Sequence, residues 1–163
     1  MVDPALRPPA NLVSPRARWY WTVRALMGWL GVFAFEVVFW PGWHRLTGEW
    51  FWVAVVTALL AAAHLIVMPQ WRYRVHRWEA SGTAVYTQSG WFNQERRIAP
   101  VARIQTVDTN RGPFEQVFGL SNVTVTTASA AGPLKIHGLE RGLADRLADD
   151  LSLRTQSAGG DGT

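Results

Sequence analysis

The sequence has 163 residues, enough for one small domain and a second element. It contains no cysteine, which excludes disulfides, thiolate metal sites and cysteine nucleophiles. The formal net charge is +4, but the surplus arginines flank apolar runs, so they indicate contact with anionic lipid and not with nucleic acid.

Residues 1–18 are rich in proline and arginine and show no apolar periodicity. This composition predicts a mostly disordered cytoplasmic tail. We do not expect a cleaved secretory signal, because the following apolar run is long and no small-residue cleavage site follows it.

Two apolar runs follow, at residues 21–40 and 50–68. A helix needs about 20 apolar residues to cross a bilayer core of roughly 30 Å, and both runs have that length. Tryptophans gather at both ends of the two runs, as expected for residues at the headgroup level. The sequence therefore predicts a two-helix transmembrane hairpin over residues 19–69.

Small residues occur on both predicted spans and would allow close backbone approach in an antiparallel hairpin. The residues expected to pack in this way are Gly28, Gly31, Ala58 and Ala62.

Glu36 is the only acidic residue within the two spans, and two interpretations apply to it. It could belong to a proton or ion relay, or it could reach the far interface near His44 or Arg45. We favour the second, because a relay requires a partner at matching depth and the expected register does not bring Glu36 to His64.

The charges that flank the spans predict the topology. The link 41–49 carries few basic groups, whereas arginines precede the first span and follow the second. The positive-inside bias therefore predicts a multi-pass membrane protein with both termini in the cytoplasm.

After Pro69 the pattern changes to the period of two residues that is typical of strands. The strands are expected at residues 71–75, 84–89, 95–98, 104–109, 121–127 and 134–137. Leucines then recur every four residues from Leu139 to Leu151, which predicts an amphipathic helix. We expect a cytoplasmic domain over residues 70–154, with six or seven short antiparallel strands and one C-terminal helix, and a frayed tail over residues 155–163.

The segment Ile98–Thr127 resembles the signature of bacterial pleckstrin-homology-like (PH-like) membrane proteins of the YdbS type, and the order of spans and domain fits them. The residues that carry the resemblance are Pro100, Arg103, Ile104, Gln105, Val107, Gly112, Pro113, Phe118, Gly119, Leu120, Val123 and Val125. Val117 is a departure, because the family tends to carry a basic residue before the aromatic one.

The resemblance implies a PH-like barrel of two packed, nearly orthogonal antiparallel sheets closed by the C-terminal helix. In such a fold Phe118 would be a core anchor beside a glycine free to adopt positive φ. The resemblance also implies a partner: a larger membrane protein that carries the same kind of domain, or a second copy of this chain.

The sequence offers few groups for chemistry. The histidines include no pair at metal-ligand spacing, and no nucleophile elbow, Walker loop or dinucleotide fingerprint is present. We therefore expect no enzyme activity, no metal and no cofactor. Arg72, Arg74 and Arg77 are candidate contacts for lipid headgroups, although arginines after a span can also serve only to fix its orientation.

Three functions fit these features. The first is a membrane-anchored interaction or scaffold module without catalysis. The second is a sensor of anionic lipid headgroups through Arg72, Arg74 and Arg77, and the third is an accessory subunit of a transport or envelope-stress complex.

Overall fold

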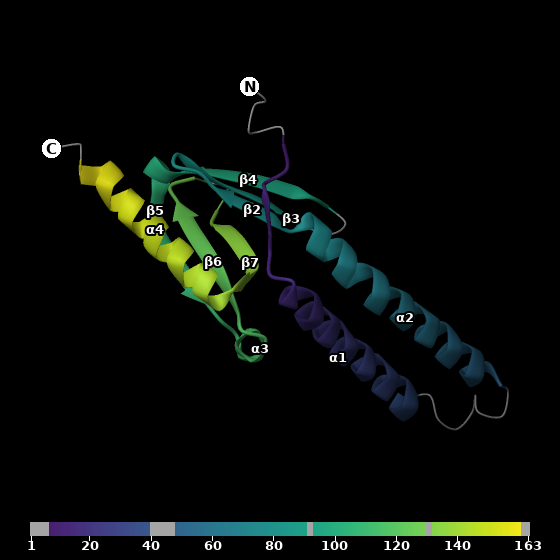
Figure 1. The fold of residues 1–163 in the computed structure, drawn as a ribbon. Coiled ribbons are helices and arrows are strands. Elements are labelled where there is room, and N and C mark those ends of the chain that lie inside the picture. The colour runs from purple at the N-terminus through teal and green to yellow at the C-terminus, as the bar shows by residue number, and fades with distance from the viewer. Residues whose placement is uncertain (1–6, 40–47, 91–92, 130–131, 161–163) are drawn as a thin grey trace. The chain divides into compact units, whose positions relative to one another are not determined.

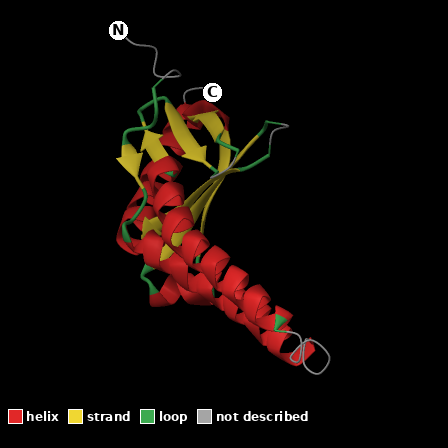
Figure 2. Cartoon of the chain, turned by 90° about the vertical axis from the view of Figure 1, so that its right-hand side faces the viewer, coloured by secondary structure: helices red, strands yellow, loops and turns green. Residues whose placement is uncertain are grey.

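The computed structural model describes residues 7–39, 48–90, 93–129 and 132–160. It divides into two compact units, a helical unit of Arg18–Trp71 and a sheet unit formed by the described residues before and after it. Figure 1 labels the elements along the chain, and Figure 2 distinguishes the helices from the strands.

The helical unit consists of the greater part of α1 (Arg16–Phe39) and α2 (Glu49–Val75). Both helices are long and apolar enough to cross a membrane, as the sequence predicts. Their sides are largely open to the surroundings: Leu30 is 58% exposed and Leu59 66% exposed, the exposure expected of apolar side chains that face lipid. Trp40 and the link to residue 47 lie outside the described residues.

The predicted strand at residues 71–75 is wrong, because α2 continues through Pro69 to Val75. The alternation of Arg72 and Arg74 with apolar residues imitates a strand, but in the last turn of a helix these cations are stabilised by the negative end of the helix dipole. Pro69 lies inside this helix, which continues past it although proline lacks the backbone N–H that donates within a helix. The first strand after the spans therefore begins at Arg77.

The sheet unit contains seven strands in two separate antiparallel sheets, so the expected closed barrel is not present. The first sheet has the order β1-β2-β3-β4, with β1 (Asn11–Leu12), β2 (Arg77–Ala80), β3 (Ala84–Ser89) and β4 (Glu95–Pro100). The second has the order β5-β6-β7, with β5 (Ile104–Asn110), β6 (Leu120–Thr127) and β7 (Leu134–Glu140). A 3₁₀ turn, η1 (Val101–Arg103), joins the sheets, and the helices are α3 (Pro113–Val117) and α4 (Arg141–Gly160).

The core lies between the second sheet and α4, which packs on β5 and β6. Val123 and Val125 of β6 are fully buried, and their neighbours in the strand are less so, as the period-two pattern predicts. Leu147 and Leu151 form the buried stripe of α4. Its predicted amphipathic face is thus the face that covers the sheet.

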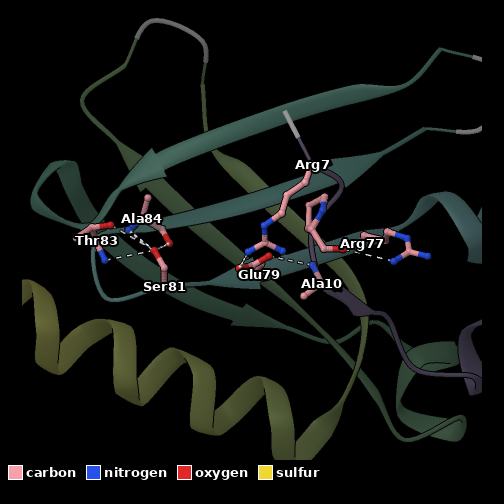
Figure 3. Close-up of polar contacts among 8 residues, drawn as sticks. Arg7, Ala10, Arg77, Glu79, Ser81, Thr83 and Ala84 are labelled. Atoms are coloured by element: carbon pink, nitrogen blue, oxygen red, sulfur yellow. Dashed lines mark hydrogen bonds and ion pairs between the residues drawn. The ribbon is translucent and has the colours of Figure 1, made fainter. Parts of the chain in front are cut away.

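The segment before the first span is not the disordered tail that the sequence suggests, over the part that the structure describes. Asn11 and Leu12 form β1, which pairs with Trp78 and Arg77 of β2. Glu79 accepts hydrogen bonds from the Arg7 guanidinium at 2.5 Å and from the Ala10 backbone N–H at 3.0 Å (Figure 3). Proline-rich composition argued for disorder, but here the edge of β2 supplies the missing backbone partners.

Two further backbone hydrogen bonds continue this attachment toward the first span. The Val13 N–H donates to the His76 carbonyl at 3.4 Å, and the Ser14 N–H donates to the Gly138 carbonyl at 2.9 Å. We call residues 7–14 the N-terminal strap.

The frayed end expected from residue 155 is also wrong in part, because α4 runs on to Gly160. In this last part of α4, Thr155 and Ser157 donate side-chain hydrogen bonds to the carbonyls of Leu151 and Arg154. Once nucleated, a helix gains one hydrogen bond for each residue added.

The strap gives a first prediction. Glu79→Gln removes the charge that binds Arg7 and Ala10, and we expect a loss of about 1–2 kcal/mol in the free energy of unfolding of the sheet unit. Trypsin should also cleave faster after Arg7 and Arg16. The control is Asp149→Asn on the exposed face of α4, and equal effects of both changes would contradict the assigned role of the strap.

Candidate functional site

The two long helices hold each other through polar side chains in an otherwise apolar surface. Trp29 Nε1 donates to His64 Nδ1 at 2.9 Å, with the rings edge to face, and Thr57 Oγ1 donates to Glu36 Oε1 at 2.6 Å. Since Nδ1 of His64 accepts, Nε2 carries the proton of the neutral ring. Thr57 is buried and lies on the same helix face as Ala61 and His64.

These contacts correct the expected packing of the hairpin. Gly28, Gly31, Ala58 and Ala62 are exposed, and a Cβ on either glycine would meet nothing within 4 Å. The register differs by three residues from the expected one, because Glu36 meets Thr57 and not Ala54. Glu36 thus has a hydroxyl partner in the facing helix, whereas His44 and Arg45 lie outside the described residues.

The three candidate lipid-binding arginines do not form one exposed group. Arg74 is exposed, but Arg72 is only partly exposed. The Arg77 guanidinium lies against the backbone, with Nε donating to the Arg74 carbonyl at 3.4 Å and NH1 to the Pro9 carbonyl at 3.5 Å (Figure 3).

His76 occupies the single position between α2 and β2 and is 5% exposed. Its backbone N–H and its ring Nδ1 both lie close to the Arg72 carbonyl, at 3.0 Å and 2.8 Å. A carbonyl only accepts, so Nδ1 carries the proton and the ring closes the end of the helix.

The pKa of His76 is lowered from 6.5 to about 4, mainly by burial and to a smaller extent by the charges of Arg72 and His137, while the hydrogen bond to the Arg72 carbonyl opposes this shift. The pKa of His137 is lowered by partial burial of its ring and by the charges of Arg72 and Lys135, although the residue lies on the outer face of β7. His76 is therefore neutral at pH 7.

The hollow around His76 is lined by Thr87, Gln88, Lys135 and His137 and has a volume of about 10 Å³. A water molecule needs at least about this much space, so the hollow excludes any larger ligand. Over the described ranges, no three His, Asp or Glu side chains gather in a way that could hold a metal ion. His76 and His137 therefore belong to a closely packed part of the sheet unit and not to a ligand site.

The residues of the sequence signature surround the turn from the first sheet to the second and the start of β6. Pro100 ends β4, and η1 leads directly to the buried Ile104 at the start of β5, as predicted. Gly112 precedes α3, which begins at Pro113.

Gly119 has the positive φ expected of it, +66°. The core anchor beside it is Leu120, which is fully buried, whereas Phe118 is only half-buried.

Comparison with known proteins agrees with this architecture. The family described as "Bacterial PH domain" matches this sequence over residues 25–155. The chain belongs to the bacterial PH domain family. It is also 30% identical, over 154 residues, to the UPF0699 transmembrane protein YdbS of Bacillus subtilis strain 168, an alignment that covers 88% of this chain and 91% of that protein. No solved structure is significantly similar to the chain.

Membership in the bacterial PH domain family confirms the resemblance carried by the signature residues, and the match to YdbS agrees with a membrane protein of two candidate spans. The matched range begins inside α1 and ends inside α4. The family description therefore covers the helical hairpin together with the sheets.

The polar pairs of the hairpin give a second prediction. Trp29→Phe keeps the aromatic ring but removes the donor to His64, and we expect a loss of about 0.5–2 kcal/mol in hairpin stability. Equilibrium unfolding in mixed detergent micelles measures this loss. Trp52→Phe is the control, because Trp52 is 67% exposed; a loss as large at Trp52 would argue against the pairing.

The third prediction concerns pH. Below pH 6.5 the unfolded chain protonates His76 while the folded chain resists until about pH 4, so folding stability falls between these values and levels off below them. A shift of this size corresponds to a loss on the order of 3 kcal/mol. Thermal unfolding followed by tryptophan fluorescence should show the loss, and His76→Gln should remove most of it. A profile of His76→Gln that still falls as steeply as that of the wild type would refute the assignment.

Proposed function

We propose that this member of the bacterial PH domain family is a non-catalytic interaction module, fixed at the cytoplasmic face of the plasma membrane, that pairs with another protein through a sheet edge. The proposal rests on the position of β5 at the edge of its sheet. This seven-residue strand ends its sheet and, within the described chain, pairs with β6 alone.

The composition of β5 favours the binding of a partner's strand to its edge. Only Asp108 is charged, and Thr106, Thr109 and Asn110 are exposed. Free edges are usually protected by lysine, proline or a covering segment, because unpaired N–H and C=O groups bind further strands. The edge of β2 is covered by the strap, and β4 carries Glu95, Arg96 and Arg97. Within the described residues no strand pairs with the outer edge of β5, and an extended segment of a partner could add to it.

The strap supports the proposed topology. If both long helices span the membrane, residues 11–12 and the domain must lie on the same side, because β1 pairs with β2. The bias of arginines toward the flanks of the hairpin supports the cytoplasmic side.

The connections to the spans keep the module near the lipid surface. α2 ends at Val75 and β2 begins at Arg77, while α1 begins two residues after Ser14, which is bonded to Gly138. A link of one or two residues spans at most about 3.5 Å per residue, so the module has little freedom to leave the surface. The partner is accordingly expected to be a membrane protein, either another PH-like protein or a second copy of this chain.

Because the chain has no cysteine, single introduced cysteines can map the partner, which is the fourth prediction. In native membranes Thr109→Cys, on β5, should give a discrete cross-linked product with a short cross-linker that attaches to the cysteine and is activated by light, so that the partner needs no cysteine of its own. Asp149→Cys, on the exposed face of α4, should not. A monomer at both positions, with function in the cell intact, would refute the proposal.

A further inference from the structure

Three arginines from distant parts of the chain meet around an open hollow of the sheet unit. The hollow has a volume of about 470 Å³ and is lined by Arg111, Gln116, Gly119, Leu120 and Arg141. Arg16 joins them, because its NH1 lies 3.2 Å from the position that a Cβ on Gly119 would occupy. The chain thus brings together the residue that begins α1, the residue after β5 and the residue that begins α4.

The positive charge here exceeds the nearby negative charge. Asp145 is the carboxylate that pairs with the arginines of the lining, at 3.7 Å from Arg111 and 3.9 Å from Arg141. Both distances are too long for good hydrogen bonds, and one carboxylate is shared by two guanidinium groups. Within the described residues, no ion pair joins an acidic side chain to Arg16.

The backbone adds to this positive field. Both α1 and α4 begin with an arginine and have no acidic residue in the first turn. A cation at the amino end of a helix is unfavourable, because the helix dipole is positive there. The amino end of α4 therefore adds a positive field to the arginines of the hollow, which a bound anion would stabilise.

The other groups at the hollow leave room for an anion. Gly119 adopts φ +66° and presents no side chain, so the Arg16 guanidinium lies directly over the backbone. The carboxylate of Glu115 is turned toward Gly112, where an added Cβ would lie 2.5 Å from its Oε2. Leu120 forms a buried floor.

We propose that Arg16, Arg111 and Arg141 form a binding site for a phosphate group, as carried by a phospholipid headgroup or by free phosphate. Guanidinium groups bind phosphate oxygens in pairs, with two parallel hydrogen bonds each. The site differs from the expected set Arg72, Arg74 and Arg77. It needs no protein partner, so it stands or falls independently of the interaction through β5.

The sequence position of Arg16 favours a lipid source. Arg16 lies three residues before Trp19, which is 68% exposed, and five before the apolar run that starts at Trp21. At about 1.5 Å per residue along a helix, the guanidinium is within reach of the headgroup layer.

The test uses the full chain in detergent micelles. Native mass spectrometry measures retention of phosphatidylglycerol, with a neutral diacylglycerol as the lipid control, and the shift in Tm measures binding of inorganic phosphate. Binding of phosphatidylglycerol with no effect of millimolar phosphate identifies a headgroup site, and a Tm shift with phosphate alone identifies a free-phosphate site. Binding of neither probe overturns the proposal.

The variants assign the binding to this hollow. Arg111→Gln with Arg141→Gln should weaken binding by at least about tenfold, since each charged hydrogen bond removed is worth about that factor. The charge-matched control, Arg96→Gln with Lys135→Gln at exposed positions, should bind as the wild type does. Equal losses in both double variants would mean that net charge alone attracts the anion, which overturns the site.

Asp145→Asn provides a test that a folding defect cannot imitate. This change removes the carboxylate that competes for Arg111 and Arg141, so binding should become severalfold tighter. Arg16→Gln lies outside the sheets and should weaken binding with an unchanged Tm of the ligand-free protein. Weaker binding in Asp145→Asn, or wild-type binding in Arg16→Gln, would overturn the proposed arrangement.

Discussion

The hydrogen bond from the Val13 N–H to the His76 carbonyl is the constraint on which the rest of the structure depends, together with the pairing of β1 with β2. It joins the chain just before the first long helix to the chain just after the second. The strap covers an edge of β2, and His76 is buried beside Val13. Arg16 follows directly and reaches Gly119. Without this junction, the domain would be joined to the hairpin through α2 alone and the outer edge of β2 would be open.

Inside the hairpin, the polar side chains of the two helices find partners because they have the same spacing along each helix. Trp29 and Glu36 are seven residues apart on α1, and Thr57 and His64 are seven apart on α2. On each helix the two polar residues are two turns apart. Both hydrogen bonds between the helices therefore form at once when the helices run antiparallel. In an apolar environment an unpaired polar group is costly, and the pairs therefore fix rotation and register more strongly than small residues would. Gly28 and Ala62 are left on exposed faces.

The sequence predicted those features whose pattern lies within a single segment of the chain. The spans follow from length and apolarity, and β3 and β6 from alternation within one segment. The end of α2 was missed because Arg72 and Arg74 alternate as in a strand, although cations also suit a helix end. The seven-residue spacing in the hairpin was visible but carries weight only when both helices are compared. The strap and the arginine hollow rest on pairings between residues that are distant in the chain, such as Arg16 and Gly119, and no local pattern encodes these.

The strap also determines the order in which the protein can assemble. Residues 7–14 leave the ribosome before either long helix, whereas their partners at Glu79 and Gly138 are made after both. The first segment to be synthesised is therefore among the last to find its place, and its pairing closes a very long loop. A hairpin already inserted in the membrane brings residues 16 and 75 near each other and lowers the entropy lost in that closure. The hairpin would then insert in the bilayer first, and the sheet unit would complete its folding only after this insertion.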